Sequence, residues 1–461
     1  MVKRGNLRDA IREEAREIPI VVDCDICIVG GSCTGVFAAI SAARLGARVA
    51  IVENNGFFGG AATASLVSTW HSIYDTTGHQ QIIAGLTVEV VERLKKRQAV
   101  FVSGSNEIPP VYCRINTEEL KIELDELVIE AGVQPFLHTR FGSPILSDGE
   151  LVAIAIEDKS GRRAIKASYF VDATGDGDLI VRMGLPFYKT EHLQPPTMVS
   201  IIRGLDEIQK SHPGFSLNQA VFDPQYRNAL RKVRFASGKV PGSRDDTWVA
   251  GTAVPGADCS DADQLTKAEM EGRRQVRVIC DILRENFIAD NLGPLAVLPS
   301  AIGIRETRHA RCLHTLTETE VLNGKRFRDA IANGIYCIDI HHPDKPVVWK
   351  RYLDGTEESI FPDGERKVGR WRDESLESAT FYQIPYSSLV PQGATNVLVA
   401  GRVIDADVGA FGAIRVMINC NQTGEAAGMA SYLALDGNIS VAEVDTSKLR
   451  EIMQKQGSII I

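Results

Sequence analysis

Two adjacent histidines between carboxylates form a group of side chains that could carry out acid–base chemistry. They lie at residues 339–344, in the order Asp-Ile-His-His-Pro-Asp. A histidine exchanges a proton near neutral pH, so His341 or a neighbour is a candidate for handling a substrate proton. The alternative is that these residues cap a loop before the proline. Adjacent residues of a strand point to opposite faces, which disfavours one shared metal ion, and we expect no metal site.

Two arginines, Arg305 and Arg308, are spaced to share one face of a helix or loop. A guanidinium group can bind a carboxylate through two parallel hydrogen bonds or polarise a carbonyl group. Arg305 is therefore the candidate for orienting a polar substrate. An ion pair with Glu306 or with another acid explains the same residues without any substrate.

A glycine-rich turn near the N-terminus predicts the element that would hold a nucleotide. An apolar strand at Ile26 to Val29 leads into the turn, and the apolar side chains from Val36 to Leu45 have helical spacing. Backbone N–H groups at the start of such a helix bind a diphosphate when glycines let it approach. The candidate contacts are Gly30, Gly31, Ser32, Cys33, Thr34 and Gly35.

The turn departs from the usual G-x-G-x-x-G pattern at its middle glycine, where this chain has Ser32. The serine side chain is small, and its hydroxyl group could bond a phosphate oxygen. A second strand, Arg48 to Glu53, ends in an acid placed to accept a hydrogen bond from a ribose hydroxyl group and to disfavour a 2′-phosphate. A strand-to-helix turn without a ligand is the alternative.

Several motifs together carry a resemblance that covers nearly the whole chain. In their order and spacing they resemble the FAD-dependent oxidoreductase family of glutathione-reductase-type flavoproteins. The motifs are residues 28–35, 59–63, 171–176, 399–402 and 424–428, with residues 303–308 and 384–386 in the middle of the chain.

The resemblance implies FAD as the cofactor and assigns further residues to it. The residues that would lie along the pyrophosphate and the flavin edge are Gly59, Gly60, Ala62 and Thr63. The nucleotide half would be closed by Thr174, Gly175 and Asp176. The ribityl chain and pyrophosphate would be reached by Gly401, Arg402 and Asp407, and a following helix with Gly424 would aim at the flavin.

Arg415 precedes this small-residue helix and is a candidate cation for the flavin. Reduced flavin carries negative charge near N1, which a cation or a helix N-terminus stabilises. A surface or domain-contact role is the alternative for Arg415, and tight helix packing is the alternative for residues 424–428. His71 follows the flavin-edge motif and could approach the ring.

The element pattern predicts an α/β protein, a Rossmann-type FAD-binding domain with an inserted α+β substrate domain. Residues 18–185 and 386–461 would form the FAD-binding domain, and 186–385 the insertion. We also expect a short charged helix at about Leu7 to Glu17, a helix at Thr117 to Glu130, a hairpin of Leu151–Glu157 with Arg163–Phe170, and a long helix at about Arg415 to Leu435.

Composition excludes several classes of partner. The net charge is −8 and both signs are mixed along the chain, which argues against nucleic-acid binding. Apolar stretches are too short to span a membrane. The charged residues 1–18 lack the apolar core of a signal peptide, and nine scattered cysteines suit a reducing compartment, so we expect a cytoplasmic protein. Self-association into a homo-oligomer is left open.

These features predict an FAD-dependent oxidoreductase that transfers hydride between flavin N5 and a small-molecule substrate. An NAD-dependent dehydrogenase shares the first turn but does not explain the second Gly-Arg segment, Gly401-Arg402. A nucleotide-binding scaffold without catalysis is a third interpretation.

Overall fold

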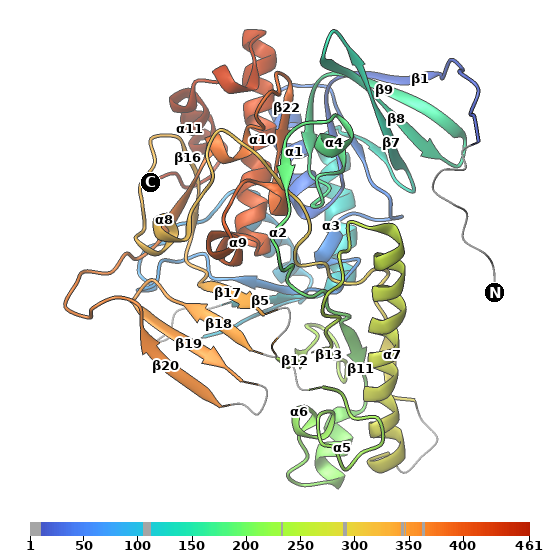
Figure 1. The fold of residues 1–461 in the computed structure, drawn as a ribbon, viewed down its shortest axis with the longest axis vertical. Helices are drawn as coiled ribbons and strands as arrows, with labels where there is room; N and C mark the ends of the chain where they lie inside the picture. Colours follow the sequence, from blue (N-terminus) through green and yellow to red (C-terminus); the bar gives the residue numbers. More distant parts are fainter. Residues whose placement is uncertain are drawn as a thin grey trace.

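The computed structural model describes residues 11–104, 112–231, 234–288, 293–342, 345, 347–361 and 365–461. Its centre is a sheet of seven described strands in the order β6-β2-β1-β9-β8-β7, with β22 also beside β9 (Figure 1). Strands β6, β2, β1, β9 and β22 are parallel, and β7 and β8 are antiparallel. Their bounds are β1 Ile20–Val29, β2 Val49–Val52, β6 Gln134–Phe136, β7 Arg140–Ser147, β8 Glu150–Asp158, β9 Gly161–Asp172 and β22 Val397–Val399.

The first β-α-β unit has the form expected from the glycine turn. Strand β1 is buried from Ile26 to Val29, and α1 (Cys33–Arg44) begins directly after the turn. Ser32 is the N-cap residue of α1, and its hydroxyl oxygen accepts the N–H of Gly35 at 3.3 Å. Gly30 has φ +104°, a conformation that L side chains rarely adopt. The serine that replaces the middle glycine thus contributes to the start of the helix.

Strand β9 connects distant parts of the chain. Its first half pairs with β8 in the predicted hairpin, and its second half pairs with β22. Val399 of β22 lies opposite Asp172, the last residue of β9. This register places the Gly401-Arg402 segment beside the loop that starts at Thr174.

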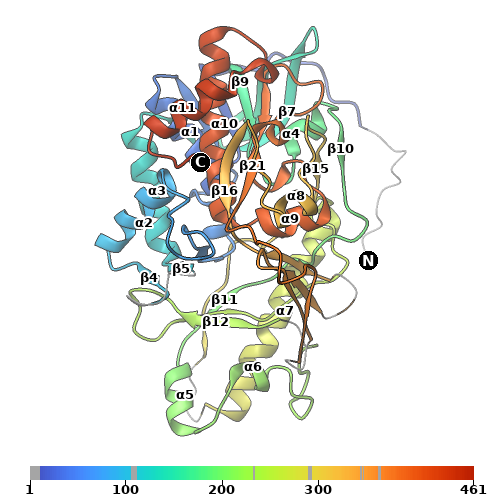
Figure 2. The same ribbon diagram turned by 90° about the vertical axis from the view of Figure 1, so that its left-hand side faces the viewer.

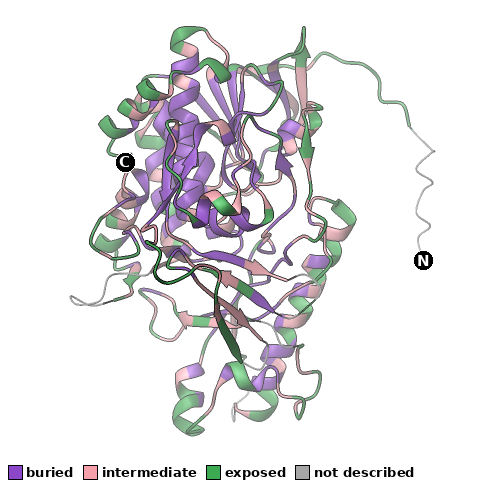
Figure 3. Ribbon diagram, turned by 60° about the vertical axis from the view of Figure 1, so that its left-hand side comes forward, coloured by how far each residue is buried: buried purple, intermediate pink, exposed green. Residues whose placement is uncertain are grey.

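Helix α10 (Met417–Gly437) runs through the centre of the molecule and packs on α1. Figure 3 shows this helix and the central sheet as the most buried part of the structure. The two backbones touch at two glycines. A Cβ atom on Gly424 would lie 2.1 Å from the carbonyl oxygen of Thr34, and one on Gly428 would lie 2.1 Å from that of Ala38. Tight packing is thus the reason for these glycines.

Two smaller sheets lie below the central sheet in Figures 1 and 2. One has the order β12-β13-β11-β14 and the other β17-β18-β19-β20. A third small sheet, β3-β5-β4, comes from the N-terminal third of the chain. The bounds are β11 Ser200–Ile202, β12 Ala236–Lys239, β13 Thr247–Ala250, β14 Leu295–Val297, β17 Ile338–His341, β18 Val348–Arg351, β19 Thr356–Ile360, β20 Arg366–Arg370, β3 Thr69–His71, β4 Val100–Val102 and β5 Tyr112–Ile115.

Further helices cover these sheets. Helix α3 has the predicted bounds, Thr117–Glu130. The other α-helices in the described ranges are α2 Leu86–Lys96, α4 Asp178–Arg182, α5 Leu205–Ser211, α6 Leu217–Ala220, α7 Ala262–Asn286, α8 Glu318–Leu322, α9 Val408–Ile414 and α11 Thr446–Lys455. None of the helices in the described ranges combines the length and the apolar character needed to cross a membrane.

One prediction about the N-terminus is wrong for the described part. The expected helix at Leu7 to Glu17 begins outside the described residues, and Ile11 to Pro19 forms neither helix nor strand. Ile11 is 99% exposed, so no apolar contact stabilises a short helix there.

The predicted domain boundaries at 185/186 and 385/386 stay predictions. The main apolar core includes side chains from both predicted units, among them Ile331 and Tyr382 of the antiparallel pair β16 (Ala330–Gly334) and β21 (Tyr382–Pro385). Strands β10 (Phe187–Tyr188) and β15 (His309–Ala310) form a separate short pair.

The contact between α1 and α10 predicts the effect of adding one methyl group. We expect Gly428→Ala to lower the free energy of unfolding by about 1–3 kcal/mol, because the new Cβ atom meets a backbone carbonyl that cannot move freely. Gly437→Ala in the same helix is the matched control, since its Cβ atom would meet only the side chain of Ile439. Urea unfolding measures both, and equal stability of the two variants would contradict the prediction.

Candidate active site

The glycine turn and the second glycine segment lie directly against each other. The N–H of Gly59 donates to the carbonyl oxygen of Gly31 at 2.8 Å. A Cβ atom on Gly60 would lie 2.8 Å from the Cβ atom of Ser32. Cys33 is buried, and its thiol lies 3.6 Å from the carbonyl oxygen of Gly59. The two predicted cofactor segments thus form one continuous surface at the start of α1.

The carboxylate of Glu53 stabilises the glycine turn through hydrogen bonds. Its Oε2 accepts the N–H of Gly31 at 2.8 Å, and its Oε1 accepts the backbone and side-chain N–H groups of Asn55, both at 2.7 Å. Burial raises the pKa of Glu53, and these N–H donors oppose that shift. Among the described residues Oε2 accepts from Gly31 alone, so a lone pair is left for a ribose hydroxyl group.

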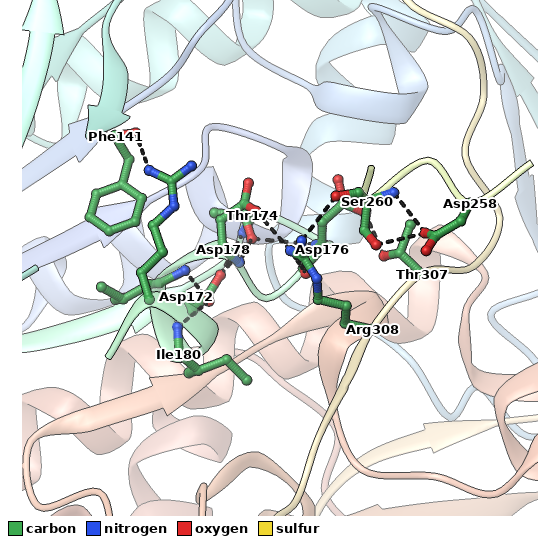
Figure 4. Close-up of polar contacts among 12 residues, drawn as sticks. Phe141, Asp172, Thr174, Asp176, Asp178, Ile180, Asp258, Ser260, Thr307 and Arg308 are labelled. Atoms are coloured by element: carbon green, nitrogen blue, oxygen red, sulfur yellow. Dashed lines mark hydrogen bonds and ion pairs between the residues drawn. The ribbon is translucent and has the colours of Figure 1, made fainter. Parts of the chain in front are cut away.

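The loop after β9 is fixed by buried hydrogen bonds (Figure 4). Asp172 accepts the Thr174 hydroxyl at 2.7 Å and the N–H groups of Leu179 and Ile180. Burial raises the pKa of Asp172 to about 6. Asp176 accepts the hydroxyl of Thr307 at 2.7 Å. Thr174 and Asp176 therefore shape the loop itself.

Arg402 has one end anchored and one end without a protein partner. Its Nη2 lies 3.3 Å from Asp176, whereas its buried Nη1 has no hydrogen-bond partner among the described residues. Gly175 has φ +77°, a conformation that favours glycine, and a Cβ atom there would also lie 2.7 Å from this guanidinium. A free guanidinium donor near the start of α1 fits an anionic group such as the FAD diphosphate.

Other predicted cofactor residues serve packing or capping in the structure. Asp407 caps α9 by accepting the N–H of Ala410 at 2.8 Å, and it also accepts the N–H of Glu318. Gly424 contacts α1, as described above. Thr63 donates to the carbonyl oxygen of Phe58 at 2.7 Å, and Ala62 is buried beside it. Asp407 and Gly424 thus have these roles within the protein, and their predicted cofactor contacts stay predictions.

A cavity of about 410 Å³ lies between the predicted FAD-binding segments and the small sheets, in the size range of small-molecule sites. It brings together four of the predicted residues, Arg305, His341, Arg402 and Arg415. Residues of the flavin-edge loop and of the start of α10 also line it, as do His71, Tyr336 and Asp339.

Asp339 lies at the centre of the polar wall of this cavity. Its Oδ1 is 3.7 Å from Nε2 of His341, and its Oδ2 is 3.8 Å from Nη2 of Arg415. Tyr336 donates its hydroxyl group to Oδ2 at 2.5 Å. Burial alone would raise the pKa of Asp339, but the charges of Arg415 and Arg234 beside it hold the pKa below its usual range. Asp339 is therefore a carboxylate at neutral pH.

The two histidines of the cavity are neutral at neutral pH. Burial and the charge of Arg305 lower the pKa of His341 well below its usual value, although Asp339 opposes the shift. Burial lowers the pKa of His71 to about 4. The His71 ring packs on Tyr336 with 4.2 Å between ring centroids. A neutral imidazole is able to accept a proton.

Arg308 does not share its contacts with Arg305, the arginine predicted to lie on the same face. It donates to the backbone oxygens of Asp176 and Ser260 and to the carboxylate of Asp178, at 3.0–3.1 Å (Figure 4). The alternative, an ion pair with another acid, therefore describes Arg308. Arg305 donates instead to the carbonyl oxygen of Pro195.

Arg114, Arg234 and Trp248 also line the cavity and were not predicted from the sequence. They lie on or beside short strands of the small sheets, and no motif in the sequence marks them. Part of the predicted histidine segment, residues 343–344, lies outside the described residues.

A glycine turn at the start of α1, an acid at the end of β2 and a cavity joined to a second Gly-Arg segment define a Rossmann-type nucleotide-binding enzyme fold. The chain matches the model of the "FAD dependent oxidoreductase" family over residues 25–453. It belongs to this family.

Comparisons with individual proteins give more distant similarities. A ferredoxin–NADP reductase of Neorickettsia sennetsu is 26% identical over 174 residues, 36% of this chain and 50% of the reductase. The chain thus matches about half the length of that relative. A geranylgeranyl bacteriochlorophyll reductase-like protein of Thermoplasma acidophilum aligns with 94% of this chain and 84% of its own, at 11% identity and a TM-score of 0.47. OxyS anhydrotetracycline hydroxylase of Streptomyces rimosus aligns over 95% and 66%, at 12% identity and a TM-score of 0.44.

The family confirms the predicted cofactor and class: this is an FAD-dependent enzyme of the Rossmann type. It favours FAD over the NAD-dependent alternative and an enzyme over a scaffold. The glutathione-reductase-type subclass stays a prediction.

The contacts of Glu53 predict how FAD binding depends on it. We expect Glu53→Gln to weaken FAD binding about tenfold or more, because an amide nitrogen would face N–H donors that the carboxylate now accepts. Titration of the apoprotein with FAD, followed by flavin fluorescence, measures the change. The exposed acid Glu150 supplies the control, Glu150→Gln. Unchanged affinity in Glu53→Gln would count against the assigned ribose contact.

Proposed function

We propose that this flavoenzyme transfers hydride between N5 of FAD and a small-molecule substrate bound in the cavity. The observation that carries the proposal is the lining of the cavity. Ala61, Arg402 and Met417 belong to FAD-binding segments, and they share this space with His341 and Arg305 from the middle of the chain. When bound, FAD supplies the hydride acceptor or donor.

In this proposal Arg305 orients the substrate. One of its nitrogens donates to the carbonyl oxygen of Pro195, which fixes the side chain at the cavity. Its remaining N–H donors can bind a carboxylate or a carbonyl oxygen of the substrate. Holding the substrate in one orientation is the main contribution of the protein to hydride transfer.

His341 handles the proton that accompanies the hydride. Because its pKa is lowered, the imidazole can accept a proton from a substrate hydroxyl or amino group at neutral pH. The carboxylate of Asp339, 3.7 Å from Nε2, stabilises the imidazolium that forms. In the reverse direction the same group returns the proton.

The start of α10 and Arg415 make one end of the cavity positive. Val416 is the N-cap residue of α10, and no side chain caps the helix start. The Nε of Arg415 is buried and has no partner within the described ranges. The free Nε–H donor of Arg415 and the helix N-terminus both stabilise negative charge at this end of the cavity.

Two observations on the purified protein test the proposal. Bound oxidised flavin gives a visible absorption spectrum, and an anaerobic screen of hydroxy, amino and unsaturated acids should find a compound that bleaches it. Reduced enzyme should in turn be reoxidised by the product or by an unsaturated acid. Protein that binds FAD but is neither bleached nor reoxidised by any compound of this kind would refute hydride transfer.

His341 is expected to control the rate of the proton-coupled step. With FAD still bound, His341→Ala should slow single-turnover flavin reduction by about two orders of magnitude or more. Stopped-flow absorbance measures this rate with the compound found in the screen. His79→Ala, a change at an exposed histidine, is the control. An unaltered reduction rate in His341→Ala would eliminate the proposed role.

The lowered pKa of His341 also predicts the pH dependence. A base with a lowered pKa keeps its proton-accepting form as the pH falls through 6.5, the usual value for histidine. We therefore expect kcat/KM for substrate oxidation to stay constant between pH 8 and 6 and to fall only in more acidic solution. A loss of activity centred at pH 6.5 or above would contradict a buried neutral histidine.

A further inference from the structure

The cavity carries more positive charge than the chain itself neutralises. Among the lining residues that the structure describes, five are arginines and one, Asp339, is an acid. Asp339 lies between Arg415 and Arg234, at 3.8 and 3.9 Å. Arg402 has its own partner, Asp176. These two carboxylates thus account for three of the five arginines.

Arg305 and Arg114 are the two cavity arginines left without an acid. Neither forms an ion pair within 4.0 Å with any carboxylate of the described ranges, although both are only partly exposed. Burial and the charge of Arg415 lower the pKa of Arg305. A partly buried cation without a counterion destabilises the structure, and an anionic ligand removes that penalty.

The two arginines belong to different walls of the cavity. Arg305 lies beside Pro195, in the wall that holds His341. Arg114 belongs to β5, and its guanidinium lies 5.6 Å from the ring centroids of Tyr112 and Trp248. Because the two guanidinium groups have different neighbours, we treat them as two anion-binding positions.

The position of Arg114 is built into the neighbouring sheet. A Cβ atom on Gly238 of β12 would lie 1.8 Å from Nη1 of Arg114, so only glycine leaves room for the guanidinium. The Nε of Arg114 is buried and lacks a hydrogen-bond partner among the described residues. The ring of Trp248 is held by a 2.6 Å hydrogen bond from its Nε1 to the carbonyl oxygen of Leu66. Arg114 thus packs against Gly238 and two aromatic rings and keeps a free donor.

Apolar side chains also line this cavity. They belong to Val67, Val199, Ala236, Trp248, Ala250 and Ile304. A ligand with a hydrocarbon middle and a charge at each end matches this arrangement, because apolar surface is buried while both ends form charge-assisted hydrogen bonds. A monocarboxylate brings one negative charge, whereas two of the cavity arginines lack an acid.

We propose that the substrate is a small dicarboxylate, with one carboxylate bound by Arg305 near His341 and the other by Arg114 beside Trp248. This inference rests on the proposed hydride transfer, for which the Arg305 end places the reacting carbon next to His341. The Arg114 end sets the length and charge of the substrate.

Ligand binding to the oxidised holoenzyme tests the substrate class without turnover. Malonate, succinate and glutarate are titrated against propanoate, butanoate and pentanoate, monocarboxylates with the same carbon numbers, and against inorganic phosphate. Perturbation of the flavin spectrum or of tryptophan fluorescence reports binding. We expect at least one dicarboxylate to bind tenfold or more tightly than its monocarboxylate partner and than phosphate. Equal affinities, or tighter phosphate binding, would overturn the proposal.

Substitutions assign the two ends. Arg114→Gln and Arg305→Gln should each reduce the preference for the dicarboxylate to less than threefold, whereas Arg114→Lys should keep part of it because the charge remains. The exposed Arg140 supplies the control, Arg140→Gln, which should keep the full preference. Full preference in folded, flavin-containing Arg114→Gln would refute the second anion position.

These experiments distinguish failure of the dicarboxylate proposal from failure of the proposed hydride transfer. Dicarboxylate binding without bleaching or reoxidation of the flavin by any acid would support this anion site and refute hydride transfer. Bleaching by a neutral or singly charged compound, with no preference for dicarboxylates, would support hydride transfer and refute the dicarboxylate.

Discussion

The direct backbone contact between α1 and α10 is the constraint on which the site depends. Gly424 and Gly428 let α10 lie against the carbonyl oxygens of Thr34 and Ala38, so the two helices have one relative position. One helix begins at the glycine turn, and the other begins at Arg415 and Val416 beside the cavity. The contact therefore fixes the distance between the nucleotide end of the site and its reacting end.

The sequence predicted the elements with strong local patterns. The β-α-β unit, the hairpin and helices α3 and α10 follow from apolar periodicity and from glycines with defined conformations. The charged N-terminal segment has such a pattern from Leu7 to Glu17, but Ile11 packs on nothing, and the described part is not helical. Periodicity alone does not supply the tertiary contacts that stabilise a short helix.

The candidate site was predictable only where a motif marked it. Arg305 and His341 were found by residue type, and the structure brings both to one cavity. Arg114 and Arg234 were missed because they lie far apart in the chain and have no neighbours that indicate chemistry. Gly424 matched a cofactor motif, yet its conformation serves helix packing. Local sequence patterns do not show which distant residues the fold brings together, so Arg114 and Arg234 could not be predicted.

The order of segments in the central sheet has a consequence for biosynthesis. Strand β9 must pair with β22, and α1 must pack on α10, but β22 and α10 come from the last 65 residues of the chain. A ribosome-bound chain that has already exposed α1 and β9 still lacks these partners, and its sheet edge and apolar helix face are open to solvent. A chain without these segments lacks two elements of the site and is more exposed to aggregation and to chaperones than the folded protein.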